Sequence, residues 1–169
     1  RSRSKSRSRL RFAGGGLGGP LARTPRPWYN LAMNLLHYFR TPGLGVARRR
    51  ALLELARGFH RGVEAVDTEV CFNVGLEGPL GAEDERVLRW LLAETFEPHA
   101  FGPSSFLDGS AGVLLEVGPR LSFTTAWSSN AVSVCRACGL DRVVRIEPSR
   151  RYLLRARDPL PAAAVEAFL

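Results

Sequence analysis

The sequence predicts a domain of mixed α and β structure, and two kinds of apolar spacing indicate it. Residues 46–59 and 82–96 carry apolar side chains at helical spacing, with charged side chains on the opposite face. Residues 63–74 largely alternate apolar and polar, and residues 111–118 form a short apolar run, as strands do. A loop is expected over 101–110. Because helical and strand patterns alternate along the chain, helices should pack against a sheet.

The remaining segments extend this pattern. An apolar, aromatic run at 35–39 ends at a Thr-Pro-Gly turn and predicts a further strand. A helix is expected from about 127 to 138, after several possible N-cap residues and before Gly139 as its C-cap. Residues 143–147 and 152–156 flank a Pro-Ser-Arg-Arg sequence, which predicts a β-hairpin.

Length and composition indicate one domain with an N-terminal tail. The chain has 169 residues, 45% of them hydrophobic, and no run of 18 apolar residues that would predict a membrane span. Residues 1–32 combine an alternating Arg/Ser run with glycines and prolines, and they are expected to be disordered. Residues 33–158 form the expected domain, and 159–169 the start of a truncated following segment. Because Met33 is the single methionine, we interpret it as the natural start and 1–32 as an erroneous extension.

The excess positive charge belongs to this tail. Residues 1–32 contain eight basic side chains and no acidic one, which matches the net charge of +8 of the whole chain. Residues 33–169 are therefore net neutral, and we do not expect a nucleic-acid-binding surface on the folded part. An RNA-associated protein acting through the Arg/Ser tail is the alternative function.

The cysteines predict structure rather than chemistry. Cys135 and Cys138 form a CxxC pair, but a zinc site usually needs four ligands, and no matching second pair exists. Both lie in the last turn of the helix expected at 127–138, so we expect structural helix cysteines and no metal site. Three cysteines without a secretion signal fit a reducing compartment, and a cytoplasmic location is expected.

An arginine and several hydroxyl residues lie between a strand end and the start of that helix. A guanidinium and the free amides of a helix N-terminus can together bind an anion. The alternative is that the hydroxyl residues cap the helix and that the arginine pairs with a carboxylate. The candidate residues are Arg120, Thr124, Thr125, Ser128 and Ser129.

At this point the sequence resembles a known family. Residues 114–140, with 143–147 and 150–152, resemble the N-terminal domain of the phosphoribosylformylglycinamidine synthase family, glutamine-dependent amidotransferases of purine synthesis. The shared pattern is a Pro-Arg segment, a Trp-Ser-Ser triplet, a helix ending in Gly-Leu and an Arg-Ile-Glu strand leading to a tyrosine. Residues 36–43 and 69–74 look like the animal form of that domain.

The resemblance implies a fold and a parent enzyme. The implied fold is α+β, a mostly antiparallel sheet with helices packed on one face, internally duplicated. The implied parent adds an ATP- and magnesium-dependent synthetase region and a glutaminase with a Cys-His-Glu triad, which would be the partners of this domain. The chain itself is expected to hold no cofactor and to have no catalytic residue. The candidate residues of the Arg120–Ser129 segment would border the synthetase active site.

Overall fold

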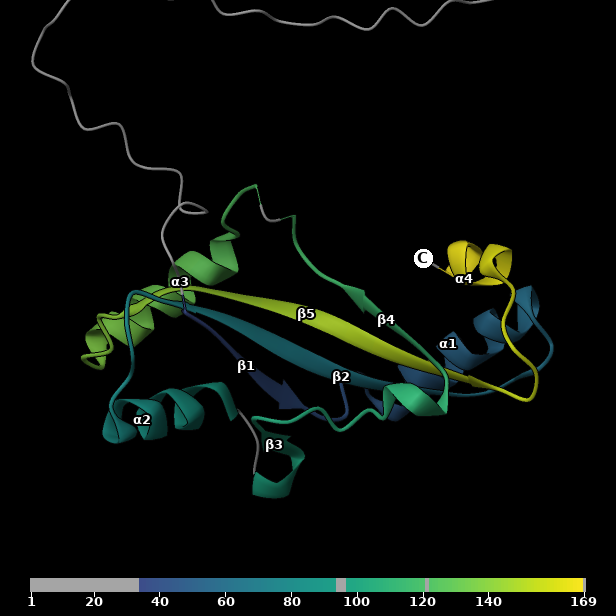
Figure 1. Ribbon diagram of the computed structural model, residues 1–169, viewed down its shortest axis with the longest axis horizontal. Coiled ribbons are helices and arrows are strands. Elements are labelled where there is room, and N and C mark those ends of the chain that lie inside the picture. Colours follow the sequence, from purple (N-terminus) through teal and green to yellow (C-terminus); the bar gives the residue numbers. More distant parts are fainter. Residues whose placement is uncertain (1–33, 94–96, 121, 169) are drawn as a thin grey trace, which may run out of the picture. The chain divides into compact units, whose positions relative to one another are not determined.

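The computed structural model describes residues 34–93, 97–120 and 122–168, which form a five-stranded antiparallel sheet and four α-helices (Figure 1). This confirms the α+β class, while the tail expected at 1–32 lies outside the described residues. None of the helices in these ranges is long and apolar enough to cross a membrane. In sheet order the strands are β3 (Phe101–Gly102), β1 (Asn34–Arg40), β2 (Val63–Leu76), β5 (Val143–Ala156) and β4 (Val113–Val117); the helices are α1 (Val46–Phe59), α2 (Ala82–Ala93), α3 (Ala126–Ala137) and α4 (Ala162–Phe168).

The predicted hairpin at 143–156 is wrong, because these residues form one continuous strand, β5. Pro148 and its polar neighbours suggested a turn, yet Pro148 lies opposite Phe72 of β2 in the middle of the ladder. Strand β4 ends opposite Arg150, so at Pro148 β5 has a strand neighbour on one side only. A residue without an N–H is tolerated at such an edge position.

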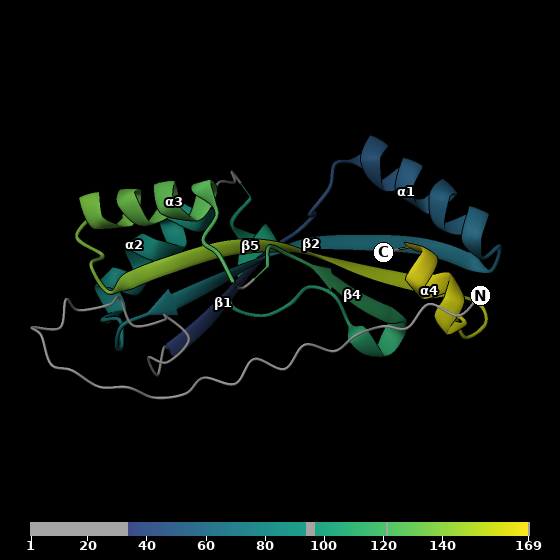
Figure 2. The same ribbon diagram turned by 90° about the horizontal axis from the view of Figure 1, so that it is seen from above.

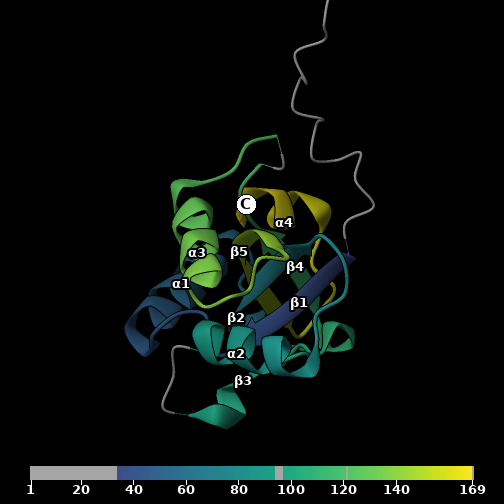
Figure 3. The ribbon, with the colours of Figure 1, turned by 90° about the vertical axis from the view of Figure 1, so that its left-hand side faces the viewer.

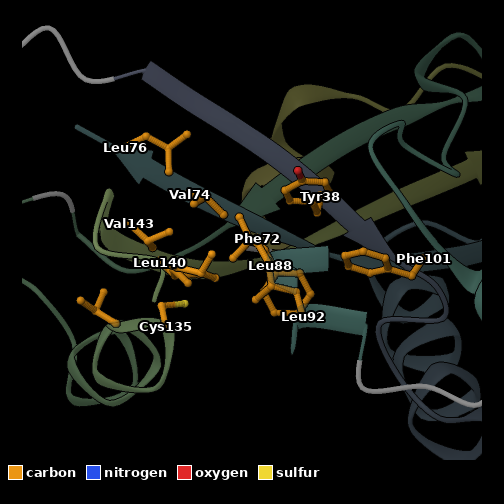
Figure 4. Packing of buried hydrophobic residues seen from close by; sticks show 12 residues of the cluster. Tyr38, Phe72, Val74, Leu76, Leu88, Leu92, Phe101, Cys135, Leu140 and Val143 are labelled. Atoms are coloured by element: carbon orange, nitrogen blue, oxygen red, sulfur yellow. The ribbon is translucent and has the colours of Figure 1, made fainter. Parts of the chain in front are cut away.

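Two hydrophobic clusters lie on one face of the sheet. Side chains two residues apart on a strand share a face, and Val66, Phe72 and Val74 of β2 are all on the same one. Phe72 and Val74 pack with α2 and α3, as Figure 4 shows for Leu88 and Cys135. Val66 packs with residues of α1 and α4 at the other end. In Figure 2, α2 and α3 accordingly gather at one end of the strands and α1 and α4 at the other.

The fold is internally duplicated, as the resemblance implied. The order strand, helix, long strand, helix occurs twice, in β1-α1-β2-α2 and again in β4-α3-β5-α4. Helix α1 begins at residue 46 and α3 at 126, β2 at 63 and β5 at 143, and α2 at 82 and α4 at 162, so the repeat is 80 residues. Figure 3 views the sheet from the end that carries α2 and α3, with α1 and α4 behind it.

The opposite face of the sheet is crossed by residues 103–112, where the sequence predicted only a loop. This segment leads from β3 at one edge to β4 at the other and buries Glu69 of β2, whose exposed fraction is 0%. The Ser105 hydroxyl donates to Glu69 Oε1 at 2.7 Å, and the Phe106 amide donates to Oε2 at 2.8 Å. Arg151 Nη1 of β5 lies 2.6 Å from Oε1. The buried charge is therefore paired and hydrogen-bonded, as burial requires.

We expect Glu69→Ala to lower the free energy of unfolding by about 3 kcal/mol, because it leaves the largely buried Arg151 without its closest anion. The matched control is Glu83→Ala, which removes an exposed ion pair with Arg86 and should leave the melting temperature unchanged. Guanidinium unfolding of both variants measures the difference. Equal stability of the two variants would contradict a structural role for Glu69.

Candidate functional site

The N-terminus of α3 is held by a buried carboxylate. Glu147 accepts hydrogen bonds from the Thr125 amide at 3.1 Å and from the Thr125 hydroxyl at 2.7 Å. Thr125 is the N-cap, and its hydroxyl oxygen accepts from the Ser128 amide at 3.1 Å. Arg145 pairs with Glu147 at 3.2 Å and donates to the Phe123 carbonyl at 2.7 Å. The preceding loop and the helix start are thus tied to β5.

The structure separates the five candidate residues into two groups. Thr125 and Ser128 make internal contacts: Thr125 caps α3, and the fully buried Ser128 accepts a hydrogen bond from the Ile146 amide at 3.2 Å. These contacts stabilise the junction between α3 and β5. The remaining three are exposed at the surface beside the helix start: Arg120, Thr124 and Ser129.

A cleft of about 500 Å³, here called the central cleft, lies on the helix-covered side of the sheet between the two hydrophobic clusters. Strands β1, β2 and β5 supply most of its lining, and the end of β4 and the first turn of α3 complete it. The described residues that line the central cleft are Arg40, Val70, Phe72, Val117, Gly118, Pro119, Trp127, Pro148, Arg150 and Tyr152.

Two arginines project from one row of the sheet in this cleft. The strand registers place Arg40 opposite Val70, Val70 opposite Arg150, and Arg150 opposite Val117. With strands about 4.8 Å apart, the Cα atoms of Arg40 and Arg150 are separated by roughly 10 Å. Of the described lining residues, none is acidic, so the cleft carries positive charge.

Aromatic side chains flank the arginine row. Phe72 and Trp127 stack with ring centroids 6.2 Å apart, and the Arg40 guanidinium carbon lies 5.4 Å from the centre of the Phe72 ring. Tyr152 lies on the other side of the row and meets Phe168 of α4 edge-on at 6.1 Å. The cleft therefore combines guanidinium groups with aromatic surface, and Trp127 is 42% exposed.

Sequence reasoning missed this cleft, although Pro119 and Trp127 belong to the segment that it singled out. The two arginines are 110 positions apart and meet only through the register of β1, β2 and β5. The wrong hairpin also placed Arg150 in a turn. The 80-residue repeat was the signal that could have aligned β5 with β2 as a single long strand.

The three cysteines have different surroundings, and two are buried. Burial raises the pKa of the Cys71 thiol to about 11, although His37 Nδ1 lies 3.8 Å from its sulfur. Burial also raises the pKa of Cys135, which packs in the cluster under α3. Since the thiolate is the nucleophile, neither thiol is activated at neutral pH. Cys138 is the exposed C-cap of α3, so the CxxC pair ends a helix, as expected.

Comparisons with known proteins bear on the whole domain. The family described as formylglycinamide ribonucleotide amidotransferase N-terminal matches residues 69–169. A probable phosphoribosylformylglycinamidine synthase of Arabidopsis thaliana, named chloroplastic/mitochondrial, is 46% identical over 143 residues, 81% of this chain and 10% of the relative. The Dictyostelium discoideum phosphoribosylformylglycinamidine synthase is 36% identical over 146 residues (81% and 11%), and the Homo sapiens one is 45% identical over 109 residues (63% and 8%).

Fold and comparisons together define the N-terminal domain of an amidotransferase. The chain belongs to the formylglycinamide ribonucleotide amidotransferase N-terminal family, and its relatives are named phosphoribosylformylglycinamidine synthases, as the resemblance predicted. The chain spans about a tenth of the length of these relatives.

We expect one of the three thiols to react rapidly with a disulfide reagent in the native protein, and all three after denaturation. Only the Cys138 thiol is exposed, whereas burial keeps Cys71 and Cys135 protonated and inaccessible. A time course of thiol release measures the difference, with Cys138→Ser as the control that removes the rapid phase. Rapid release from two thiols would contradict the burial of Cys71 and Cys135.

Proposed function

We propose that the chain is the N-terminal, non-catalytic domain of an ATP- and glutamine-dependent phosphoribosylformylglycinamidine synthase of de novo purine biosynthesis. The observation that carries this proposal is the alignment of 81% of the chain with about a tenth of relatives that bear this name. The parent is a C–N ligase that takes its amido group from glutamine. In it, this domain stabilises the assembly and borders the synthetase active site.

The contacts within the domain support a structural role. Its buried carboxylates are engaged in the fold, since Glu69 holds the crossing segment and Glu147 holds the start of α3. The buried thiols of Cys71 and Cys135 are not activated. In this proposal, ATP and magnesium belong to the synthetase region, and the synthetase and glutaminase domains are the partners.

The proposed edge of the synthetase site is the surface beside the start of α3. Arg120, Thr124 and Ser129 are exposed there, and Thr125 and Ser128 fix the backbone that presents them. We keep the cytoplasm as the proposed location, although the Arabidopsis thaliana relative is named chloroplastic/mitochondrial.

The chain on its own is expected to neither hydrolyse glutamine nor turn over ATP, because the catalytic groups belong to the other domains. Ammonia release from glutamine and phosphate release from ATP measure the two activities, with a heat-treated sample as the control. Either activity above that control would contradict a non-catalytic domain.

In the full-length enzyme, Arg120→Ala should lower synthetase turnover by about tenfold or more and leave glutamine hydrolysis largely intact. A charged group that contacts the reacting region contributes about this much. The matched control is Arg136→Ala, which removes an exposed arginine at the opposite end of α3. Both half-reactions and the melting temperature are measured on each variant. Unchanged synthetase turnover in Arg120→Ala would remove this segment from the active-site edge.

A further inference from the structure

The fold gives no internal partner to one arginine of the central cleft. The carboxylates that pair with arginines of β5 engage Arg145, Arg151 and Arg155, and none of these ion pairs includes Arg150. Arg150 is exposed toward the cleft, in the same row of the sheet as Arg40. Two guanidinium groups that face one concave surface repel each other and favour an anion between them.

The shape of the cleft suits a small molecule. Its volume of about 500 Å³ lies within the usual range of ligand sites. The helix pairs cover the two ends of the sheet, and the cleft occupies the strip between the clusters that they form. Strands supply its floor, which keeps the two arginines at a fixed separation.

The side chains of the cleft indicate the chemistry of the ligand. Guanidinium groups bind phosphate oxygens in a bidentate manner. The Phe72–Trp127 stack and Tyr152 offer aromatic faces on either side of the arginine row, where a planar ring can stack. The basic tail at 1–32 contains no acidic residue, so it does not supply the complementary charge.

We propose that the central cleft binds a phosphate ester that carries a planar ring, a ligand of the nucleotide class. The phosphate lies against Arg150 and Arg40, and the ring stacks on the aromatic walls. This inference does not rest on the proposed function, since it uses only the residues of the cleft.

The test uses AMP, inorganic phosphate and adenosine as probes of the 169-residue chain, followed by calorimetry. AMP should bind more tightly than either of the other two, because it alone engages both the arginines and the aromatic walls. Arg150→Ala should weaken AMP binding by about tenfold or more, since it removes a charge-assisted contact. The matched control is Arg50→Ala, an exposed arginine of α1 outside the cleft, which should leave the affinity unchanged.

A second variant tests the aromatic walls. Trp127→Ala should weaken the binding of AMP and leave that of inorganic phosphate unchanged, because only AMP carries a ring. Thermal unfolding establishes that each variant remains folded. The proposal is overturned if AMP binds no more tightly than inorganic phosphate, if Arg50→Ala weakens binding as much as Arg150→Ala, or if AMP produces no heat up to about 10 mM, the limit of weak binding.

Discussion

The antiparallel pairing of β2 with β5 is the interaction on which the rest of the domain depends. Each strand has 14 residues, and they pair over nearly their whole length at the centre of the sheet. β1 and β4 add to their outer edges, and all four helices cover the face that they share. The register places Val70 opposite Arg150, two positions that are 80 residues apart, like the repeat itself. The pairing therefore relates the two halves by an approximate twofold axis at this pair.

The two halves are equivalent in backbone but not in chemistry. About the axis, Glu69 pairs with Arg151 on one side, and Cys71 pairs with Ser149 on the other. The first pair is a buried ion pair that also holds the crossing segment, and the second is uncharged. A second buried charge pair would carry a second desolvation cost. A single such pair fixes the register between the strands without that further cost.

The sequence predicted well whatever depends on local periodicity. Helix α1 begins and ends where the apolar spacing at 46–59 placed it, and α3 begins one residue before the expected start. The continuity of β5 could not be predicted locally, because Pro148 is tolerated only where a neighbouring strand has ended. At the candidate site, the capping alternative describes Thr125 and Ser128, whose partners Glu147 and Ile146 lie on another strand. Arg150 could be placed in a cleft only once the register was known.

The position of the central cleft follows from the duplication. Each half provides two helices, and since each pair forms a cluster at one end of the long strands, the strip at the axis has no helix over it. Phe72 and Tyr152 are 80 residues apart and are both aromatic, so the repeat supplies a similar wall on each side. The axis pair itself differs, with Val70 in one half and Arg150 in the other. An apolar side chain at both positions would suffice for the sheet, so the arginine at this junction has its role outside the packing of either half.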